Sequence, residues 1–117
     1  MSESKLQADI ITALCLDTRV AWVMAVTTGT FKVKGGYTTV GTYSMEDMKR
    51  RTGMADIVGQ LTTGQSLAIE VKLSGETPSK EQTEFLALVG RNNGVSGWAT
   101  SIHEAYEILD SANIRRI

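Results

Sequence analysis

The sequence predicts an α/β fold in which helices flank a mixed β-sheet, and three observations support this class. Segments with helical spacing of apolar residues alternate with short segments rich in β-branched and aromatic residues. The stretch Thr62-Thr63-Gly64 separates two predicted strands, which is typical of an antiparallel hairpin. A strand, a helix and a strand follow one another over residues 66–100, and that order requires a crossover and a parallel pairing.

Length and composition indicate one domain, covering residues 1–117. The chain has 117 residues, of which 42% are hydrophobic and 21% are charged, enough for one core and too few for two domains. No apolar run approaches the roughly 20 residues that cross a membrane. The N-terminal stretch has neither a basic start nor an apolar signal core. We therefore expect a soluble, cytoplasmic protein.

Charge and cysteine content narrow the chemistry. The net charge is −1, which argues against a simple electrostatic nucleic-acid binder, although carboxylates around a cation can mask a locally positive surface. The single cysteine, Cys15, excludes an internal disulfide and a zinc site built from cysteines. Its apolar sequence neighbours predict a small core residue with no chemical role.

The first helix is expected over residues 3–16, where apolar residues recur with helical spacing and Asp17 closes the segment. Glu3 and Gln7 lie on the same side of this helix as its apolar stripe. That stripe consists of Leu6, Ile10, Ala13 and Leu14. Residues 20–29 follow, and their β-branched and aromatic side chains predict a strand that ends at a glycine.

Two further elements are expected before the middle of the chain. Residues 31–43 contain two short β-like runs around Gly35-Gly36, which is a hairpin signal. Ser44 is a suitable N-cap for a short helix over residues 44–51, which ends in a Lys-Arg-Arg cluster. A hairpin and a second helix are therefore expected after the first strand.

The C-terminal half contains the strongest signals for secondary structure. Pro78 and the capping box Ser79–Gln82 predict the start of a helix within residues 78–94. A second capping box, Ser101–Glu104, predicts the start of the last helix. Strands are expected over three segments, residues 54–61, 65–73 and 95–101.

The loop Thr62-Thr63-Gly64 predicts the register of the two strands that it joins. A three-residue hairpin loop with glycine last is typical of a type I turn followed by a left-handed residue. With these residues as the loop, counting back along both strands places Asp56 directly opposite Glu70. Cβ atoms of opposed residues lie about 4.5–5.5 Å apart, and like charges there destabilise a sheet. A register shifted by one residue would instead place the two acids on opposite faces.

A divalent cation would offset the repulsion between Asp56 and Glu70. Mg²⁺ binds carboxylate oxygens at roughly 2.0–2.1 Å and keeps its other positions for water and substrate phosphate. Lys72 follows Glu70 by two residues and therefore lies on the same face of the strand. The sequence thus predicts that Lys72 reaches the same spot as the two acids.

These side chains also have ordinary structural interpretations. A Glu and a Lys two residues apart on a strand are most often solvated, so Glu70 and Lys72 alone would not indicate a site. Gln82 completes a capping box, and Glu3 and Gln7 are consistent with a frayed helix start. The acid expected on the neighbouring strand is the feature that favours a functional role.

Five segments in chain order carry a family resemblance: ESKLQADI, TGMADIVG, AIEVK, PSKEQTEFL and GVSGWATSIHEAYEIL. With these motifs the sequence resembles the VRR-NUC domain, the virus-type replication and repair nuclease branch of the PD-(D/E)XK superfamily. The resemblance extends over nearly the whole chain, and it implies a restriction-endonuclease-like core with a mixed central β-sheet flanked by helices. The family's Pro-Asp dipeptide is Ala55-Asp56 here. Because that proline binds no metal, the departure leaves the implied metal site intact.

The resemblance implies a metal site with Mg²⁺ or Mn²⁺ as cofactor. Asp56 and Glu70 resemble the metal-binding acids of the family, and the backbone carbonyl of Val71 resembles a further ligand. Glu3 matches the first-helix acid, which supports the metal through water. The implied metal set is therefore Asp56, Glu70, Val71 and Glu3.

The resemblance also implies catalytic roles. Lys72 resembles the lysine that positions or deprotonates the attacking water, and Gln7 and Gln82 match glutamines that line the site. The implied catalytic set is Lys72, Asp56, Glu70 and Gln82. The basic residues at 49–51 are candidates for contacting the DNA backbone, and a solvated helix end explains them equally well.

Together these expectations predict a metal-dependent DNA endonuclease of phage type, active in a bacterial host, that is selective for branched or four-way-junction DNA. A homodimer is also expected, with the hairpin at residues 31–43 as an exposed arm. Two other interpretations stay open. The first is a DNA-binding or replication-complex interaction module that keeps the nuclease fold without chemistry, and the second is a metal-free regulatory partner of a phage replication complex. The intact Asp, Glu and Lys set disfavours both.

Overall fold

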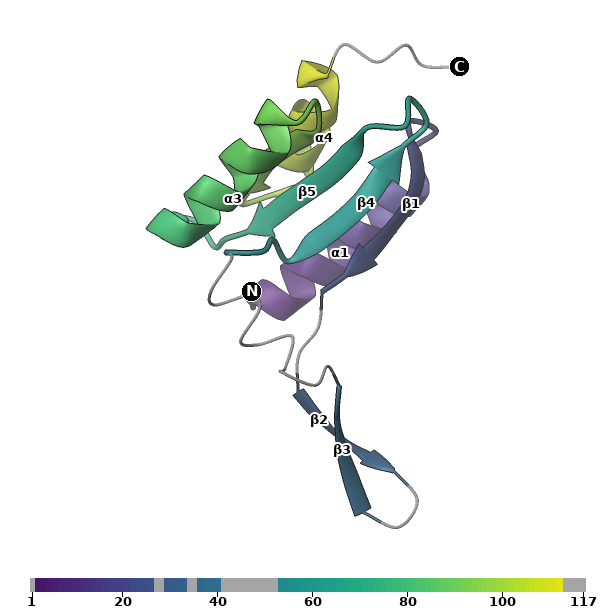
Figure 1. Ribbon diagram of the computed structural model, residues 1–117, viewed down its shortest axis with the longest axis vertical. Helices are drawn as coiled ribbons and strands as arrows, with labels where there is room; N and C mark the ends of the chain where they lie inside the picture. The colour runs from purple at the N-terminus through teal and green to yellow at the C-terminus, as the bar shows by residue number, and fades with distance from the viewer. Residues whose placement is uncertain (1, 27–28, 34–35, 41–52, 113–117) are drawn as a thin grey trace.

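The computed structural model describes residues 2–26, 29–33, 36–40 and 53–112 (Figure 1). The short helix expected over residues 44–51 lies outside them. In the described part of the chain, no helix has the length and apolar character needed to cross a membrane. The elements are α1 (Glu3–Cys15), β1 (Val20–Ala25), β2 (Gly29–Val33), β3 (Gly36–Val40), β4 (Ile57–Leu61), β5 (Ser66–Val71), α3 (Lys80–Arg91), β6 (Val95–Ala99) and α4 (Ile102–Ser111).

The main sheet is mixed, as the sequence predicts. Its four strands lie in the order β1-β4-β5-β6. β4 pairs antiparallel with both β1 and β5, whereas β5 and β6 are parallel because α3 provides the crossover between them. β2 and β3 form a separate antiparallel pair in which Val33 lies opposite Gly36. The predicted hairpin is thus confirmed, with residues 34 and 35, rather than Gly35-Gly36, between its strands.

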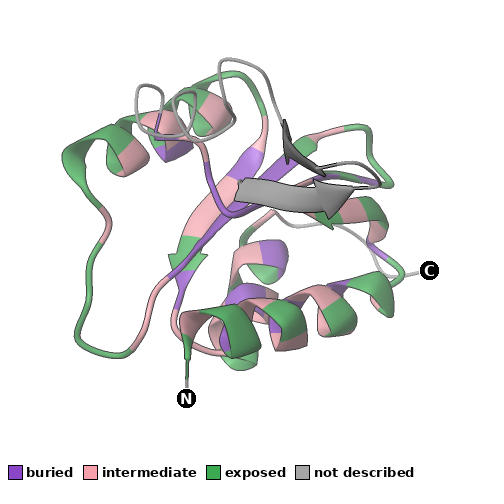
Figure 2. Ribbon diagram, turned by 90° about the horizontal axis from the view of Figure 1, so that it is seen from below, coloured by how far each residue is buried: buried purple, intermediate pink, exposed green. Residues whose placement is uncertain are grey.

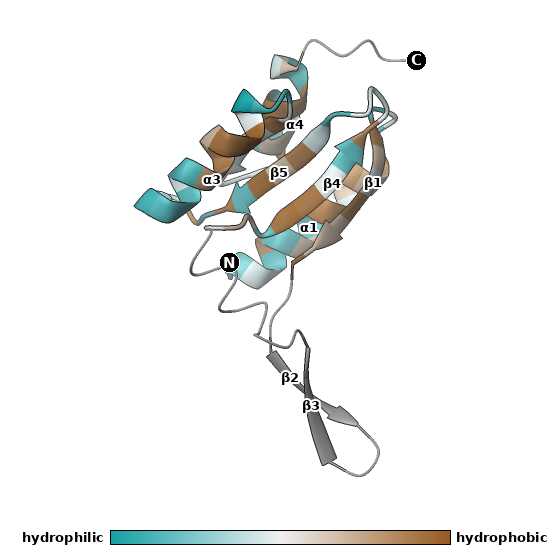
Figure 3. Cartoon of the chain, in the orientation of Figure 1, coloured by the Kyte–Doolittle hydropathy of each residue, from teal (hydrophilic) through white to brown (hydrophobic). Residues whose placement is uncertain are grey.

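Helices cover both faces of the main sheet. α1 and α4 pack together on one face, and α3 lies on the other against β5 and β6 (Figures 1 and 2). Hydrophobic residues run along the central strands, and the N-terminal end of α3 is hydrophilic (Figure 3). The larger core lies between the sheet and the α1–α4 layer. Its buried residues are Leu6, Ile10, Leu14, Ile57, Leu61, Leu67, Ile69, Val71, Val95, Ala99, Ala105 and Leu109.

The β4–β5 hairpin has the predicted loop and register. Gly64 adopts a left-handed conformation with φ of 91°, which glycine tolerates without steric cost. Its N–H donates to the Leu61 carbonyl at 2.8 Å, and the Leu61 N–H donates to the Gln65 carbonyl at 2.8 Å. The strands then pair as far as Ile57 opposite Ile69. The three-residue loop therefore determines which residues meet at the far end of the hairpin.

The two predicted capping boxes differ in the structure. At the start of α3, Ser79 and Gln82 form both hydrogen bonds of the box. At the start of α4, the Ser101 hydroxyl accepts from the Glu104 N–H, but the Glu104 carboxylate accepts from the hydroxyl and N–H of Thr100. The second prediction is therefore wrong in its reciprocal bond. Hydrogen bonds from Thr100 stabilise the ionised carboxylate of Glu104 and lower its pKa, with the larger effect from the hydroxyl and the smaller from the N–H.

Two other predictions need correction. The segment expected as one strand over residues 20–29 is divided, because β1 ends at Ala25 and β2 begins at Gly29. Cys15 is exposed rather than part of the core. It immediately follows Leu14 on α1, and successive helical residues point in directions about 100° apart, so the buried stripe excludes it.

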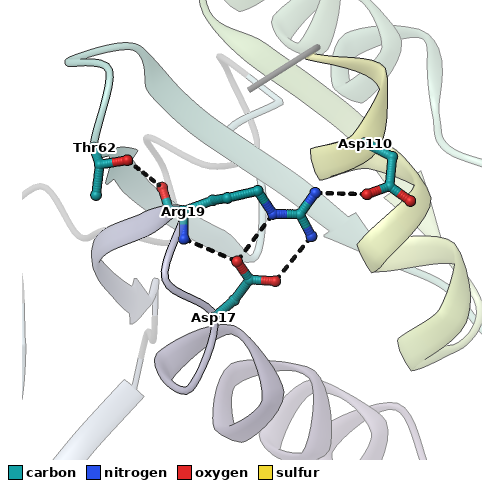
Figure 4. A network of polar contacts seen from close by, with 4 residues as sticks. All are labelled: Asp17, Arg19, Thr62 and Asp110. Carbon is teal, nitrogen blue, oxygen red and sulfur yellow. Dashed lines mark hydrogen bonds and ion pairs between the residues drawn. The ribbon is translucent and has the colours of Figure 1, made fainter. Parts of the chain in front are cut away.

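A buried arginine, which the sequence analysis did not single out, joins the end of α1, the start of β1 and α4 (Figure 4). Arg19 is 2% exposed. Its Nε and Nη2 donate to the two carboxylate oxygens of Asp17 at 3.0 and 2.8 Å, and Nη1 contacts Asp110 at 2.5 Å. Its carbonyl accepts from the Thr62 N–H and hydroxyl. The pKa of Arg19 is raised above its ordinary value, mainly by the hydrogen bonds with Asp17 and to a smaller extent by the contact with Asp110.

Candidate active site

The structure brings predicted site residues together where β4 begins and β5 ends (Figure 1). Glu70 belongs to β5, Lys72 directly follows this strand, and Gln82 lies in the first turn of α3. Asp56 immediately precedes β4. These four residues come from three segments, and the hairpin register and the capping box determine where they lie.

Glu70 is the centre of this group. Its side chain is nearly completely buried, at 1% relative exposure. Its Oε1 accepts a hydrogen bond from Gln82 Nε2 at 3.0 Å and lies 4.0 Å from Lys72 Nζ. Burying a carboxylate is costly unless charged or hydrogen-bonding groups compensate it. The nearby ammonium and amide groups supply that compensation, so Glu70 and Lys72 are not a solvated surface pair.

The capping box orients the Gln82 amide toward Glu70. Gln82 Oε1 accepts from the Ser79 N–H at 2.8 Å, and its own N–H donates to the Ser79 hydroxyl at 3.1 Å. With the amide oxygen held by Ser79, Nε2 is left to donate to Glu70. The sequence suggested two alternative roles for Gln82, and the structure shows both contacts: Gln82 caps α3, and it also donates to the buried Glu70.

Asp56 lies one residue beyond the last strand pair of the hairpin. It is buried, at 8% relative exposure. Its carboxylate Oδ2 accepts from the Val71 N–H at 3.0 Å, and its carbonyl accepts from the Val26 N–H at 2.7 Å. The predicted strand pairing continues as far as Ile57. Beyond it, the Asp56 side-chain carboxylate, rather than a backbone carbonyl, accepts the hydrogen bond from the Val71 N–H. Asp56 thus reaches the residue directly after Glu70 through its side chain instead of through a ladder pair.

A glycine that the sequence analysis did not single out positions this segment. Gly53 is buried, with φ of 68°, in the left-handed region that favours glycine. A Cβ at this position would lie 2.0 Å from the Glu81 carbonyl oxygen and 2.5 Å from the Gln82 backbone nitrogen. Only glycine therefore lets the chain before Asp56 pass directly against the first turn of α3. A glycine shortly before a predicted site acid was the available signal in the sequence.

The oxygen donors at this end of the sheet suit a hard divalent cation. Asp56 and Glu70 provide carboxylates. The N–H and C=O of one strand residue point toward the same neighbouring strand. Since the Val71 N–H points to Asp56, its carbonyl is directed to that side as well. Carboxylates together with a backbone carbonyl are a donor set typical of Mg²⁺ and Mn²⁺ sites.

The remaining predicted residues do not extend this group. Glu3 and Gln7 are half-buried on α1, which lies in the layer opposite α3 (Figure 2). Within the described ranges, no three His, Cys, Asp or Glu side chains form a group that could hold a metal ion. Glu3 is therefore not grouped with the two acids, and its water-mediated role stays a prediction. The basic residues at 49–51 lie outside the described residues.

Comparisons with known proteins leave the family unassigned. No family model matches the chain, and no curated protein and no solved structure matches it significantly. The candidate site therefore rests on the sequence pattern and on the geometry of these side chains.

Proposed function

We propose that this protein is a Mg²⁺- or Mn²⁺-dependent endonuclease that hydrolyses DNA phosphodiester bonds, with a restriction-endonuclease-like core like that of the VRR-NUC domains it resembles. One observation carries the proposal. The buried Glu70 carboxylate lies close to both the Lys72 ammonium group and the Gln82 amide through its Oε1, beside a strand end where the Asp56 carboxylate is also buried. Two buried acids and a lysine at one strand end form a set that metal-assisted hydrolysis can use.

The metal ligands would be Asp56, Glu70 and the Val71 carbonyl. When bound, the cation supplies a water of lowered pKa and charge neutralisation at the phosphate. Gln82 holds Glu70 Oε1 in a fixed direction, which preserves the orientation of the carboxylate while substrate enters. Preorganised ligands of this kind lose little energy to rearrangement during the reaction.

Lys72 would act on the attacking water and on the phosphate. Its side chain is 16% exposed and therefore partly accessible from solvent, although its ammonium group lies close to Glu70. It would orient the water for in-line attack on phosphorus and offset the negative charge that develops there. The bond from phosphorus to the 3′ oxygen would break, leaving a 5′-phosphate product by analogy with the family.

The proposal also includes the substrate and the assembly. We infer a preference for branched DNA, including four-way junctions, in a phage-type enzyme acting in the cytoplasm of a bacterial host. A two-fold dimer would present two active sites to one DNA molecule, so that two strands could be cut as a pair. The β2–β3 hairpin is the candidate arm for contact between the two subunits. Light scattering of the purified protein with and without junction DNA tests the dimer, and a monomer under both conditions would overturn it.

Cleavage assays test the activity directly. The protein would be incubated with labelled linear, flap and four-way-junction DNA in Mg²⁺, Mn²⁺ or EDTA. We expect cleavage with either metal, strongest on branched DNA, and none in EDTA. The absence of cleavage on all three substrates with both metals would overturn the nuclease proposal.

The alternative is a module that binds DNA or a replication complex without chemistry. A specific observation favours it, because two of the site residues also have structural roles. Asp56 accepts from the Val71 N–H, and Gln82 caps α3. DNA binding that is equal in Mn²⁺ and EDTA, with no cleavage, would support this alternative.

A further inference from the structure

Part of the sheet face that carries Glu70 is not covered by a described helix. Among the described helices, α3 lies on this face, and it packs against β5 and β6 rather than against β1 and β4 (Figure 1). Two large side chains of β1 are exposed, Trp22 at 49% and Met24 at 52%. Large apolar side chains in this position are candidates for contact with a ligand.

The pairing of the strands places these side chains on the same face as the candidate active site. Met24 lies opposite Val58, which lies opposite Ala68. Ala68 packs with Leu86 of α3, and Glu70 follows it by two residues, so both point to the α3 side. Trp22 shares this face because it precedes Met24 by two residues.

Trp22 is held across the sheet surface by its neighbour on β4. Its indole Nε1 donates to Gln60 Oε1 at 2.9 Å, and Gln60 is its partner in the strand pairing. The ring therefore extends from β1 toward β4, and about half of the residue stays accessible. Because the polar group of the indole is already satisfied, its free surface suits stacking rather than a new hydrogen bond.

The charge and spacing of this surface are suited to a nucleic acid chain. Neither β1 nor β4 contains a charged residue, and the positively charged Lys72 lies farther along the same face. Trp22 is level with Ser66, four residues before Glu70, which is about 13 Å along the strand. A chain whose phosphate lies at Glu70 can therefore place a nearby base over Trp22.

We propose that Trp22 stacks on an unpaired base of the substrate, with Met24 as its apolar neighbour, so that the substrate has single-stranded nucleotides next to the bond to be cut. The inference rests on the proposed nuclease function. Base-on-aromatic stacking is sequence-tolerant and occurs on sheet surfaces of other single-strand binders. Two side chains form a patch much smaller than the roughly 800 Å² per partner of a stable protein interface, which disfavours a second copy as the occupant.

Binding without cleavage tests the inference. Anisotropy of a labelled oligothymidylate would be measured in EDTA for the wild type and for Trp22→Ala, Trp22→Phe and Leu88→Ala. Leu88 is an apolar residue on α3 with similar exposure, 47%, and serves as the control. Trp22→Ala should weaken single-strand binding by about 5- to 150-fold, the equivalent of roughly 1–3 kcal/mol per stacked base. Trp22→Phe should keep most of the affinity, and Leu88→Ala and duplex binding should be unchanged.

Intrinsic fluorescence adds a direct readout. In a Trp98→Phe background Trp22 is the single tryptophan, and its emission should be quenched by oligothymidylate but not by polyphosphate. Equal single-strand affinity of Trp22→Ala and wild type, no single-strand binding by the wild type, or unquenched emission at saturation would overturn the inference. Concentration-dependent association abolished by Trp22→Ala in the absence of DNA would also overturn it, in favour of a second copy.

The same measurements separate this inference from the nuclease proposal. If Trp22 emission is quenched and Trp22→Ala weakens binding, but no DNA is cleaved in Mn²⁺, the stacking site is supported and the nuclease function is refuted. Cleavage in Mn²⁺ with no effect of Trp22→Ala on binding would remove the stacking site alone.

Discussion

Gln82 Nε2 donates a hydrogen bond to the buried Glu70 carboxylate at 3.0 Å, and this contact connects the start of α3 to the end of β5. The capping box with Ser79 prevents the amide from turning away. A local signal for helix initiation thereby also orients a candidate active-site acid.

Replacing Gln82 by Glu should destabilise the metal-free protein more than replacing it by Ala. Glu keeps an oxygen for the Ser79 N–H but places a second carboxylate beside buried Glu70, and like charges there repel. Urea unfolding at neutral pH would measure both variants. Ser79→Ala is the control for the cap alone, with an expected cost of about 0.5–2 kcal/mol. Wild-type stability of Gln82→Glu would contradict the contact between Gln82 and Glu70.

Lys72→Ala should abolish DNA cleavage while leaving metal binding largely intact. The ammonium group lies 4.0 Å from Glu70 Oε1 and would orient water rather than hold the cation. Cleavage of junction DNA and the Mn²⁺-dependent rise in melting temperature would be measured on the same preparation. Lys80→Ala, at an exposed lysine of α3, is the matched control. Full activity of Lys72→Ala would remove this residue from the mechanism.

Asp56→Asn should leave the metal-free fold at least as stable as the wild type. The amide oxygen can still accept from the Val71 N–H, while the substitution removes a negative charge near Glu70. Mn²⁺ should raise the melting temperature of the wild type, with a stabilisation of about 2.7 kcal/mol at 100 times Kd. The variant should barely respond. Equal Mn²⁺ responses would show that the paired-carboxylate metal site is wrong.

Asp17→Ala should destabilise the protein far more than Asp110→Ala, although both acids contact Arg19. Asp17 is 11% exposed and binds Arg19 with both oxygens, whereas Asp110 is 57% exposed. Breaking an ion pair whose two partners are both buried costs about 3–5 kcal/mol, and removing an exposed partner costs about 0–1 kcal/mol. Chemical denaturation of the two variants makes this comparison. Equal losses would mean that the exposure of the acid does not govern how much its ion pair with Arg19 stabilises the protein.

Glu104 should contribute stability that depends on pH. Because hydrogen bonds from Thr100 lower its pKa in the folded state, its contribution is complete above the ordinary glutamate pKa of about 4.3. It is lost as the pH falls from there through the lower folded-state pKa. The stability difference between wild type and Glu104→Gln should therefore shrink in acid. Exposed Glu107→Gln is the control, and a difference that grew with acidification would refute the assignment.

Several features of the candidate site could be predicted from the sequence because they depend on neighbours in the chain. The loop Thr62-Thr63-Gly64 determines the hairpin register through its backbone conformation, and the box at Ser79 starts α3 through hydrogen bonds three residues apart. The two-residue period of a strand places Glu70 and Lys72 on one face. These local rules bring the acid and the lysine to one strand end before any packing is considered.

Only the tertiary structure decided the features that depend on packing between elements. Asp56 leaves the strand ladder, because its carboxylate meets the Val71 N–H where β4 begins. Arg19 contacts Asp110 because α4 packs beside it, although the two residues are separated by 91 positions in the sequence. Gly53 is required because the backbone of Glu81 and Gln82 in α3 lies directly against it, and its position before Asp56 does not by itself reveal that distant contact. Hydrogen bonds within a turn can be predicted from the sequence because a few neighbouring residues determine their geometry. Contacts between distant segments depend instead on how the helices pack against the sheet.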